Sequence, residues 1–130
     1  MAHTYSKNLL HCVFSTKNRR PLIPSDRLER LWAYMFGIAK NLGLNLIAAG
    51  GTENHAHLLL ALPATIALAE ALKELKGYSS RWMGAGFSWQ PGYGAFSVSA
   101  SQLATVKAYI ANQAGHHKKL GNPALKCWAK

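Results

Sequence analysis

Two histidines that are separated by one residue, His55 and His57, are the first residues whose types and spacing could do chemistry. On a β-strand their side chains would point to the same face, while Ala56 between them would point into the core. Two neighbouring imidazoles can hold a metal ion. The alternative is a pair of polar residues on the solvent-facing side of a strand. The His-x-His pattern alone does not separate these two interpretations.

Tyr109 and Gln113 form a second pair, spaced four residues apart. On a helix this spacing places both side chains on one face, beside an apolar stripe made of Leu103, Val106 and Ile110. An amide oxygen can bind a hard cation, and a tyrosine one turn away can lie close to the same ion. Taken alone, the pair is more typical of a half-buried aromatic residue and a solvated amide.

The elements that position these residues are predicted from hydrophobic periodicity. We expect strands at residues 9–15, 44–49, 55–62 and within 87–98. Helices are expected from a cap at Ser25 to Gly43, from a cap at Thr65 to about Met83, and from Ser99 or Ser101 to about Lys119. Gly50 and Gly51 are expected to begin a turn.

This order of elements predicts an α+β fold. It is the order of a ferredoxin-like (RRM-like) βαββαβ sheet with an added C-terminal helix, and the added helix would carry Tyr109. We see no linker or internal repeat, so residues 1–130 are expected to form a single domain.

Charge and cysteine content narrow the class of protein. The chain has 15 Lys and Arg against 5 Asp and Glu, for a net charge of +10. Such an excess favours a polyanionic partner, with nucleic acid ahead of a membrane surface. Cys12 and Cys127 form no CxxC pair, and the beginning of the chain lacks a long apolar segment. We therefore expect a cytoplasmic protein without a membrane span.

Together, the two pairs resemble a known family, the single-tyrosine HUH transposases, which include insertion-sequence and REP-associated tyrosine transposases. His55-Ala56-His57 is similar to the HUH motif, in which U is an apolar residue, and residues 109–113 look like the nucleophile helix. Further stretches resemble the family in the same order along the chain, namely residues 11–21, 75–80 and 89–99.

The resemblance implies a specific activity. Tyr109 would attack a phosphodiester of single-stranded DNA and form a 5′-phosphotyrosine, and His55, His57 and Gln113 would bind a divalent metal, Mg²⁺ or Mn²⁺. These ligand types alone are also compatible with Zn²⁺. The DNA would contain a hairpin, the protein would be a homodimer, and no small-molecule cofactor is implied.

A further set of residues is expected to bind DNA. Its basic side chains would contact phosphates, and its two serines are included because of the family resemblance. The set consists of Lys17, Arg19, Arg20, Lys76, Ser79, Ser80, Arg81, Lys118 and Lys119. Phe87, Trp89 and Tyr93 could stack on unpaired bases, although we expect at least one of them to pack in the core. His116 and His117 are expected to stabilise the C-terminal end of the last helix.

Two alternatives to a transposase remain open at this point. One is a non-catalytic or domesticated single-stranded nucleic-acid-binding protein of the same fold. It is favoured by the net charge and by residues 121–123, Gly-Asn-Pro, which end the last helix where many family members continue with a further helical segment. The other is a hydrolytic metalloenzyme with water as the nucleophile, although Glu53 is the only carboxylate near the histidines in the sequence.

Overall fold

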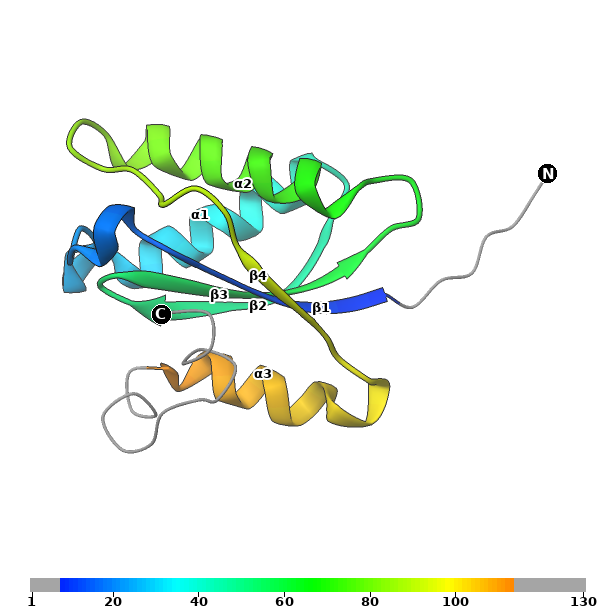
Figure 1. Cartoon of the computed structure of the whole chain (residues 1–130). Coiled ribbons are helices and arrows are strands. Elements are labelled where there is room, and N and C mark those ends of the chain that lie inside the picture. Colours follow the sequence, from blue (N-terminus) through cyan, green and yellow to red (C-terminus); the bar gives the residue numbers. More distant parts are fainter. Residues whose placement is uncertain (1–7, 114–130) are drawn as a thin grey trace.

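The computed structural model describes residues 8–113, which form a four-stranded antiparallel sheet and three α-helices. The strands are β1 (Asn8–Ser15), β2 (Asn45–Thr52), β3 (His55–Leu62) and β4 (Gly94–Ser97), in the spatial order β2-β3-β1-β4. The helices are α1 (Leu28–Asn41), α2 (Leu68–Met83) and α3 (Leu103–Ala111). Figure 1 shows α1 and α2 on one face of the sheet and α3 on the other. The predicted ferredoxin-like fold with an added helix is confirmed.

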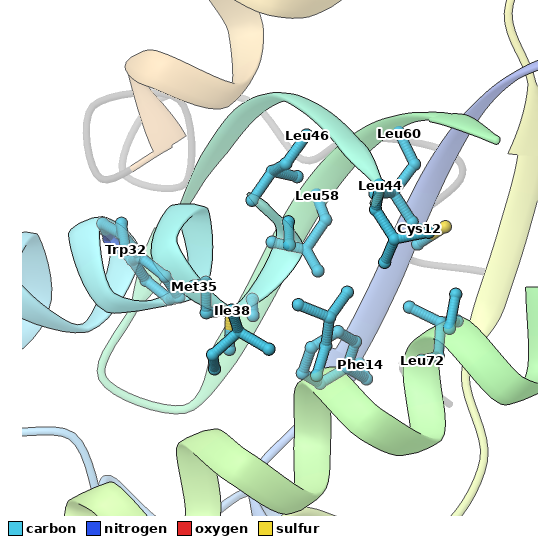
Figure 2. Close-up of a cluster of buried hydrophobic side chains, with 14 of the residues drawn as sticks. Cys12, Phe14, Trp32, Met35, Ile38, Leu44, Leu46, Leu58, Leu60 and Leu72 are labelled. Carbon is cyan, nitrogen blue, oxygen red and sulfur yellow. The ribbon is translucent and has the colours of Figure 1, made fainter. Parts of the chain in front are cut away.

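The main core lies between the sheet and the first two helices. Strands β1 and β3 contribute Phe14 and Leu58, which are completely buried, and α1 and α2 contribute Met35 and Leu75. Figure 2 shows the apolar side chains from strands and helices meeting in this layer. The helical periodicity of α1 and α2 produces this arrangement, because it places their apolar residues on one face each.

A second, smaller core lies on the other face of the sheet. Ala48 of β2, Leu59 of β3 and Ile110 of α3 are buried there, with Leu103 and Val106 partly buried around them. Because α3 covers this face, β3 is buried on both sides for nearly its whole length. The polar residues at the beginning of β3 are therefore enclosed as well.

Gly50 allows α3 to approach the sheet closely. It lies within β2 and pairs with His57 of β3. A Cβ atom at this position would overlap the carbonyl oxygen of Ile110 on α3. The prediction that Gly50 and Gly51 begin a turn is thus wrong. Both glycines continue the strand, and at Gly50 the missing side chain makes room for the packed helix.

The bounds of other strands and helices differ from the predicted ones by a few residues. Strand β2 extends to Thr52, so the turn before β3 consists of Glu53 and Asn54. Helix α2 begins at Leu68 and not near Thr65, because residues 63–66 form a turn in which the Ile66 amide donates to the Pro63 carbonyl. A 3₁₀ turn at Ser25–Arg27 precedes α1, and another at Ala100–Gln102 precedes α3.

The sequence also predicted a serine cap for the last helix and no membrane span. Ser99 is the N-terminal cap of the last helical segment, and its amide donates to the Gln102 side chain. The predicted end of that segment near Lys119 lies outside the described residues. Within residues 8–113, no helix is long and apolar enough to cross a membrane.

Replacing Gly50 with alanine tests whether α3 depends on this close approach. The added methyl group meets the backbone of α3 and must displace the helix, so Gly50→Ala should lower the free energy of unfolding by about 1–3 kcal/mol. The measurement is chemical denaturation followed by circular dichroism.

Gly37→Ala is the matched control. Gly37 lies in α1, and a Cβ atom there would have no heavy atom within 4 Å. Alanine in this exposed helical position should raise stability by about 0.5–1 kcal/mol. Equal stability of the two variants would show that Gly50 does not set the position of α3.

Candidate active site

His55 and His57 lie on the face of β3 that α3 covers, while Ala56 belongs to the main core on the opposite face. Their ring centroids are 5.1 Å apart. His57 has no exposed surface, and His55 is 8% exposed. The alternative that these histidines occupy the solvent-facing side of a strand is therefore wrong, because a helix packs over them.

Tyr109 and Gln113 reach the same face from α3. The Tyr109 ring lies 5.9 Å from the His57 ring, nearly perpendicular to it, and is half-buried. Gln113 is only 1% exposed, and its Oε1 atom is buried with no hydrogen-bond partner among residues 8–113. Gln113 also lines a cavity of about 480 Å³ together with Gly50, the residue that pairs with His57. Within one chain, Tyr109 thus lies against His57, and Gln113 lies one helical turn further along the chain, near the strand residue that pairs with His57.

The turn before β3 holds the His55 ring. Its Nδ1 atom lies 2.8 Å from Asn54 Oδ1 and 2.9 Å from Thr52 Oγ1. An amide oxygen can only accept a hydrogen bond, so His55 Nδ1 carries the proton. In this tautomer the lone pair is on Nε2, the atom that can bind a metal.

His11 is a site residue that the sequence analysis missed. It lies on β1 with 7% exposure, and its Nε2 atom is 2.8 Å from His57 Nδ1. Its ring centroid is 6.3 Å from that of Tyr109. Burial lowers the pKa of His11 from 6.5 to about 4, so the ring is neutral at neutral pH. The residue type alone could not identify it, because its position depends on the register between β1 and β3.

The donor set is compatible with a divalent cation. Within the described part of the chain, no group of three His, Cys, Asp or Glu residues could hold a metal ion. The ligands would instead be the two imidazoles of β3 and the amide oxygen of Gln113. A buried amide oxygen without a hydrogen bond is costly, and coordination to a cation would satisfy it. Three protein ligands would leave open positions for water and substrate.

A basic loop lies at the same end of the sheet. Lys17, Arg19 and Arg20 are exposed and follow directly after β1, whose last residue pairs with His55. Asn54 connects this loop to the histidine: its side-chain amide donates to the Arg19 carbonyl, and its own carbonyl accepts from the backbone amide of residue 16. Asn54 therefore joins the loop that carries three predicted DNA-binding side chains to the His55 end of the site.

Two residues of α2 have interior roles. Ser79 is completely buried; its hydroxyl donates to the Leu75 carbonyl and accepts the indole N–H of Trp89. The prediction that Ser79 contacts DNA is therefore wrong, and Trp89 is the aromatic residue that packs in the core. Lys76 is half-buried, and its ammonium group donates to the carbonyls of Gln90 and Gly92. Burial lowers the pKa of Lys76.

The DNA contact predicted for Lys76 and those of the other residues remain predictions. Ser80 is half-buried, and Arg81 is exposed with its guanidinium over the Tyr78 ring. The predicted roles of Lys118, Lys119, His116 and His117 fall on residues outside the described range.

Ser79→Ala tests the interior role of this hydroxyl. The substitution leaves the buried indole N–H of Trp89 without an acceptor, so it should cost about 1–3 kcal/mol of stability in denaturant unfolding. Ser80→Ala, its half-buried neighbour, should change stability by no more than about 0.5 kcal/mol. Folded Ser79→Ala should keep its affinity for a single-stranded oligonucleotide; a stable variant with reduced affinity would restore Ser79 as a DNA contact.

The chain is similar to known transposases in sequence and in fold. A family model described as IS200-like transposase matches residues 4–113. The ISDra2 transposase TnpA of Deinococcus radiodurans is 27% identical, over 79% of this chain and 81% of that protein. A protein of Deinococcus radiodurans R1 assigned as a transposase has a crystal structure with a TM-score of 0.68 at 27% identity, covering 87% of this chain and 96% of that chain. The structure of a REP-associated tyrosine transposase bound to a REP hairpin has a TM-score of 0.69 at 16% identity and covers 92% of this chain and 74% of that chain. At this identity the similarity supports the fold alone.

Proposed function

The chain belongs to the IS200-like transposase family, and from this premise we propose that it cuts and rejoins single-stranded DNA with Tyr109 as the nucleophile. A divalent metal, Mg²⁺ or Mn²⁺, would be held by His55, His57 and Gln113. The observation that carries this proposal is the pairing of a buried, unsatisfied Gln113 amide oxygen with Tyr109 on the helix that covers the histidines.

In the proposed reaction, the Tyr109 phenolic oxygen attacks the scissile phosphorus. The new bond joins the tyrosine oxygen to phosphorus, and the bond between phosphorus and the 3′ oxygen breaks. The phenol loses its proton to solvent, and the departing 3′ oxygen takes up a proton, which leaves a 3′-hydroxyl. The 5′ end of the downstream strand stays attached as a phosphotyrosine. Attack by a 3′-hydroxyl on this intermediate reverses the bond changes and joins strands without an external energy source.

The metal ligands and the nucleophile have separate tasks. A neutral phenol is a weak nucleophile, and a divalent cation, when bound, neutralises charge that develops on the phosphoryl oxygens. Asn54 holds His55 in the tautomer that ligation needs. Helix α3 carries both Tyr109 and Gln113, so the nucleophile and one ligand are fixed by the same packing against Leu59.

The proposed substrate is single-stranded DNA next to a hairpin. One structural relative was solved bound to a REP hairpin, and Lys17, Arg19 and Arg20 give this chain an exposed basic loop beside the site. Such contacts to phosphates would add affinity that falls with salt concentration. The homodimer implied by the resemblance stays a prediction.

A non-catalytic binding protein is the second candidate, and its support is the net charge of +10. A binding surface, however, does not need a buried, unsatisfied amide one helical turn from a tyrosine that lies against a buried histidine. A water-using hydrolase would likewise leave the position of Tyr109 unexplained. The transposase proposal accounts for all four side chains.

The direct test is covalent attachment to DNA. Purified protein, Mn²⁺ and labelled single strands from the DNA that flanks its own gene are analysed on a denaturing protein gel. We expect the label to migrate with the wild-type protein and not with Tyr109→Phe, which should still bind the same strands. Tyr34→Phe is the matched control, because Tyr34 lies on α1 against Trp82 and should leave adduct formation unchanged.

The same assay tests the metal ligands. A chelator should abolish the adduct, and Gln113→Leu, which keeps the volume but removes the amide oxygen, should shift the Mn²⁺ requirement to higher concentration. An adduct that persists in Tyr109→Phe would contradict the nucleophile assignment. Cleavage products without any protein-linked DNA would favour the hydrolase.

A further inference from the structure

We propose that His11 is a positioning residue that fixes the tautomer of His57. In this arrangement His11 Nε2 accepts a hydrogen bond from His57 Nδ1–H, which places the His57 lone pair on Nε2, where it can bind the metal. This inference rests on the proposed function, since it assigns His57 as a metal ligand. The carrying observation is the 2.8 Å distance between His11 Nε2 and His57 Nδ1 in a buried environment.

A hydrogen bond between two imidazole nitrogens needs one donor and one acceptor. If His11 were the donor, the proton of a neutral His57 would lie on Nε2, and this atom could not bind a metal. If His57 is the donor, its Nε2 atom carries the lone pair. The contact between the two rings therefore allows two arrangements, and metal binding through Nε2 selects the second. Metal-ligating histidines generally use their other ring nitrogen in this way, donating to a fixed acceptor.

The fold holds the acceptor in place. In the sheet, His11 pairs with Leu59, so it lies diagonally across from His57 on the face that α3 covers. Its ring lies near Phe96 of β4 on one side and Tyr109 of α3 on another, with centroids 6.3 Å away in each case. The buried Nε2 atom of His57 is likewise enclosed. Neither ring can easily turn away to solvent without disrupting this packing.

The two proposed ligands differ in how their tautomers are set. His55 Nδ1 lies against the amide oxygen of Asn54, which only accepts hydrogen bonds. His57 Nδ1 lies against a second imidazole, which can donate or accept. Which ring nitrogen of His57 carries the proton thus depends on His11. Replacing His11 should therefore affect metal binding although every proposed metal ligand is kept.

Two substitutions separate positioning from packing. His11→Gln keeps a group whose carbonyl oxygen can accept from His57 Nδ1, whereas His11→Leu fills a similar space without any acceptor. Mn²⁺ affinity is measured by calorimetry on the DNA-free protein, and thermal unfolding shows whether each variant is folded. We expect His11→Leu to weaken Mn²⁺ binding by about 10- to 100-fold and His11→Gln to stay within about threefold of wild type.

The tautomer itself is read from nitrogen NMR of the histidine rings in metal-free protein. We expect wild-type His57 to be protonated on Nδ1 and His11→Leu to show a larger share of the Nε2–H form. An unchanged affinity in His11→Leu, an equal loss in His11→Gln, or a wild-type His57 protonated on Nε2 would overturn the proposal. If wild-type protein binds no Mn²⁺, the proposed function fails, and the NMR result still decides whether His11 sets the tautomer.

Discussion

Helix α3 lies against the polar part of a sheet face, and the arrangement of the site depends on this contact. The face carries His11, His55 and His57, side chains that would normally stay solvated. Apolar packing of Ile110 against Ala48 and Leu59 supplies the favourable burial that brings the helix down onto them. Buried polar groups must then find partners, because an unsatisfied one costs about 1–3 kcal/mol.

The partners found on this face explain the composition of the site. His55 is held by the side chains of the preceding turn, and His57 by His11. The amide oxygen of Gln113, by contrast, is buried with no hydrogen bond in the described part of the chain. An unsatisfied acceptor on the helical segment that covers the two imidazoles is the feature that a bound cation would resolve. The stabilising packing of α3 and the proposed chemistry are therefore two consequences of one helix position.

Local patterns predicted much of this arrangement. The strand at residues 55–62 and the helical spacing of Tyr109 and Gln113 follow from periodicity, which depends only on neighbouring residues. The closeness of the two pairs came from the family resemblance, because their separation of about fifty residues gives no local signal. Gly50 was mistaken for a turn residue, since its reason for being glycine is the backbone of Ile110 on a distant helix.

The roles of His11 and Ser79 also depend on contacts between residues that are distant in the sequence. The partner of His11 depends on the pairing of β1 with β3, and the burial of Ser79 depends on Trp89 from the segment that follows α2. Both are non-local contacts, so residue type and spacing predicted no role for His11, and the DNA contact expected for Ser79 came from the family resemblance. The exposed loop at residues 17–20 was easier to predict, because Pro21 and a run of basic side chains are local signals.

The most direct test of this account is a crystal structure of the protein grown with Mn²⁺, with anomalous diffraction data collected near the manganese absorption edge. We expect an anomalous peak bound by His55 Nε2, His57 Nε2 and Gln113 Oε1, with the Tyr109 hydroxyl facing the open coordination positions. A manganese peak elsewhere on the chain, or a Gln113 side chain that turns away from the ion, would contradict the central claim that the packing of α3 builds the metal site.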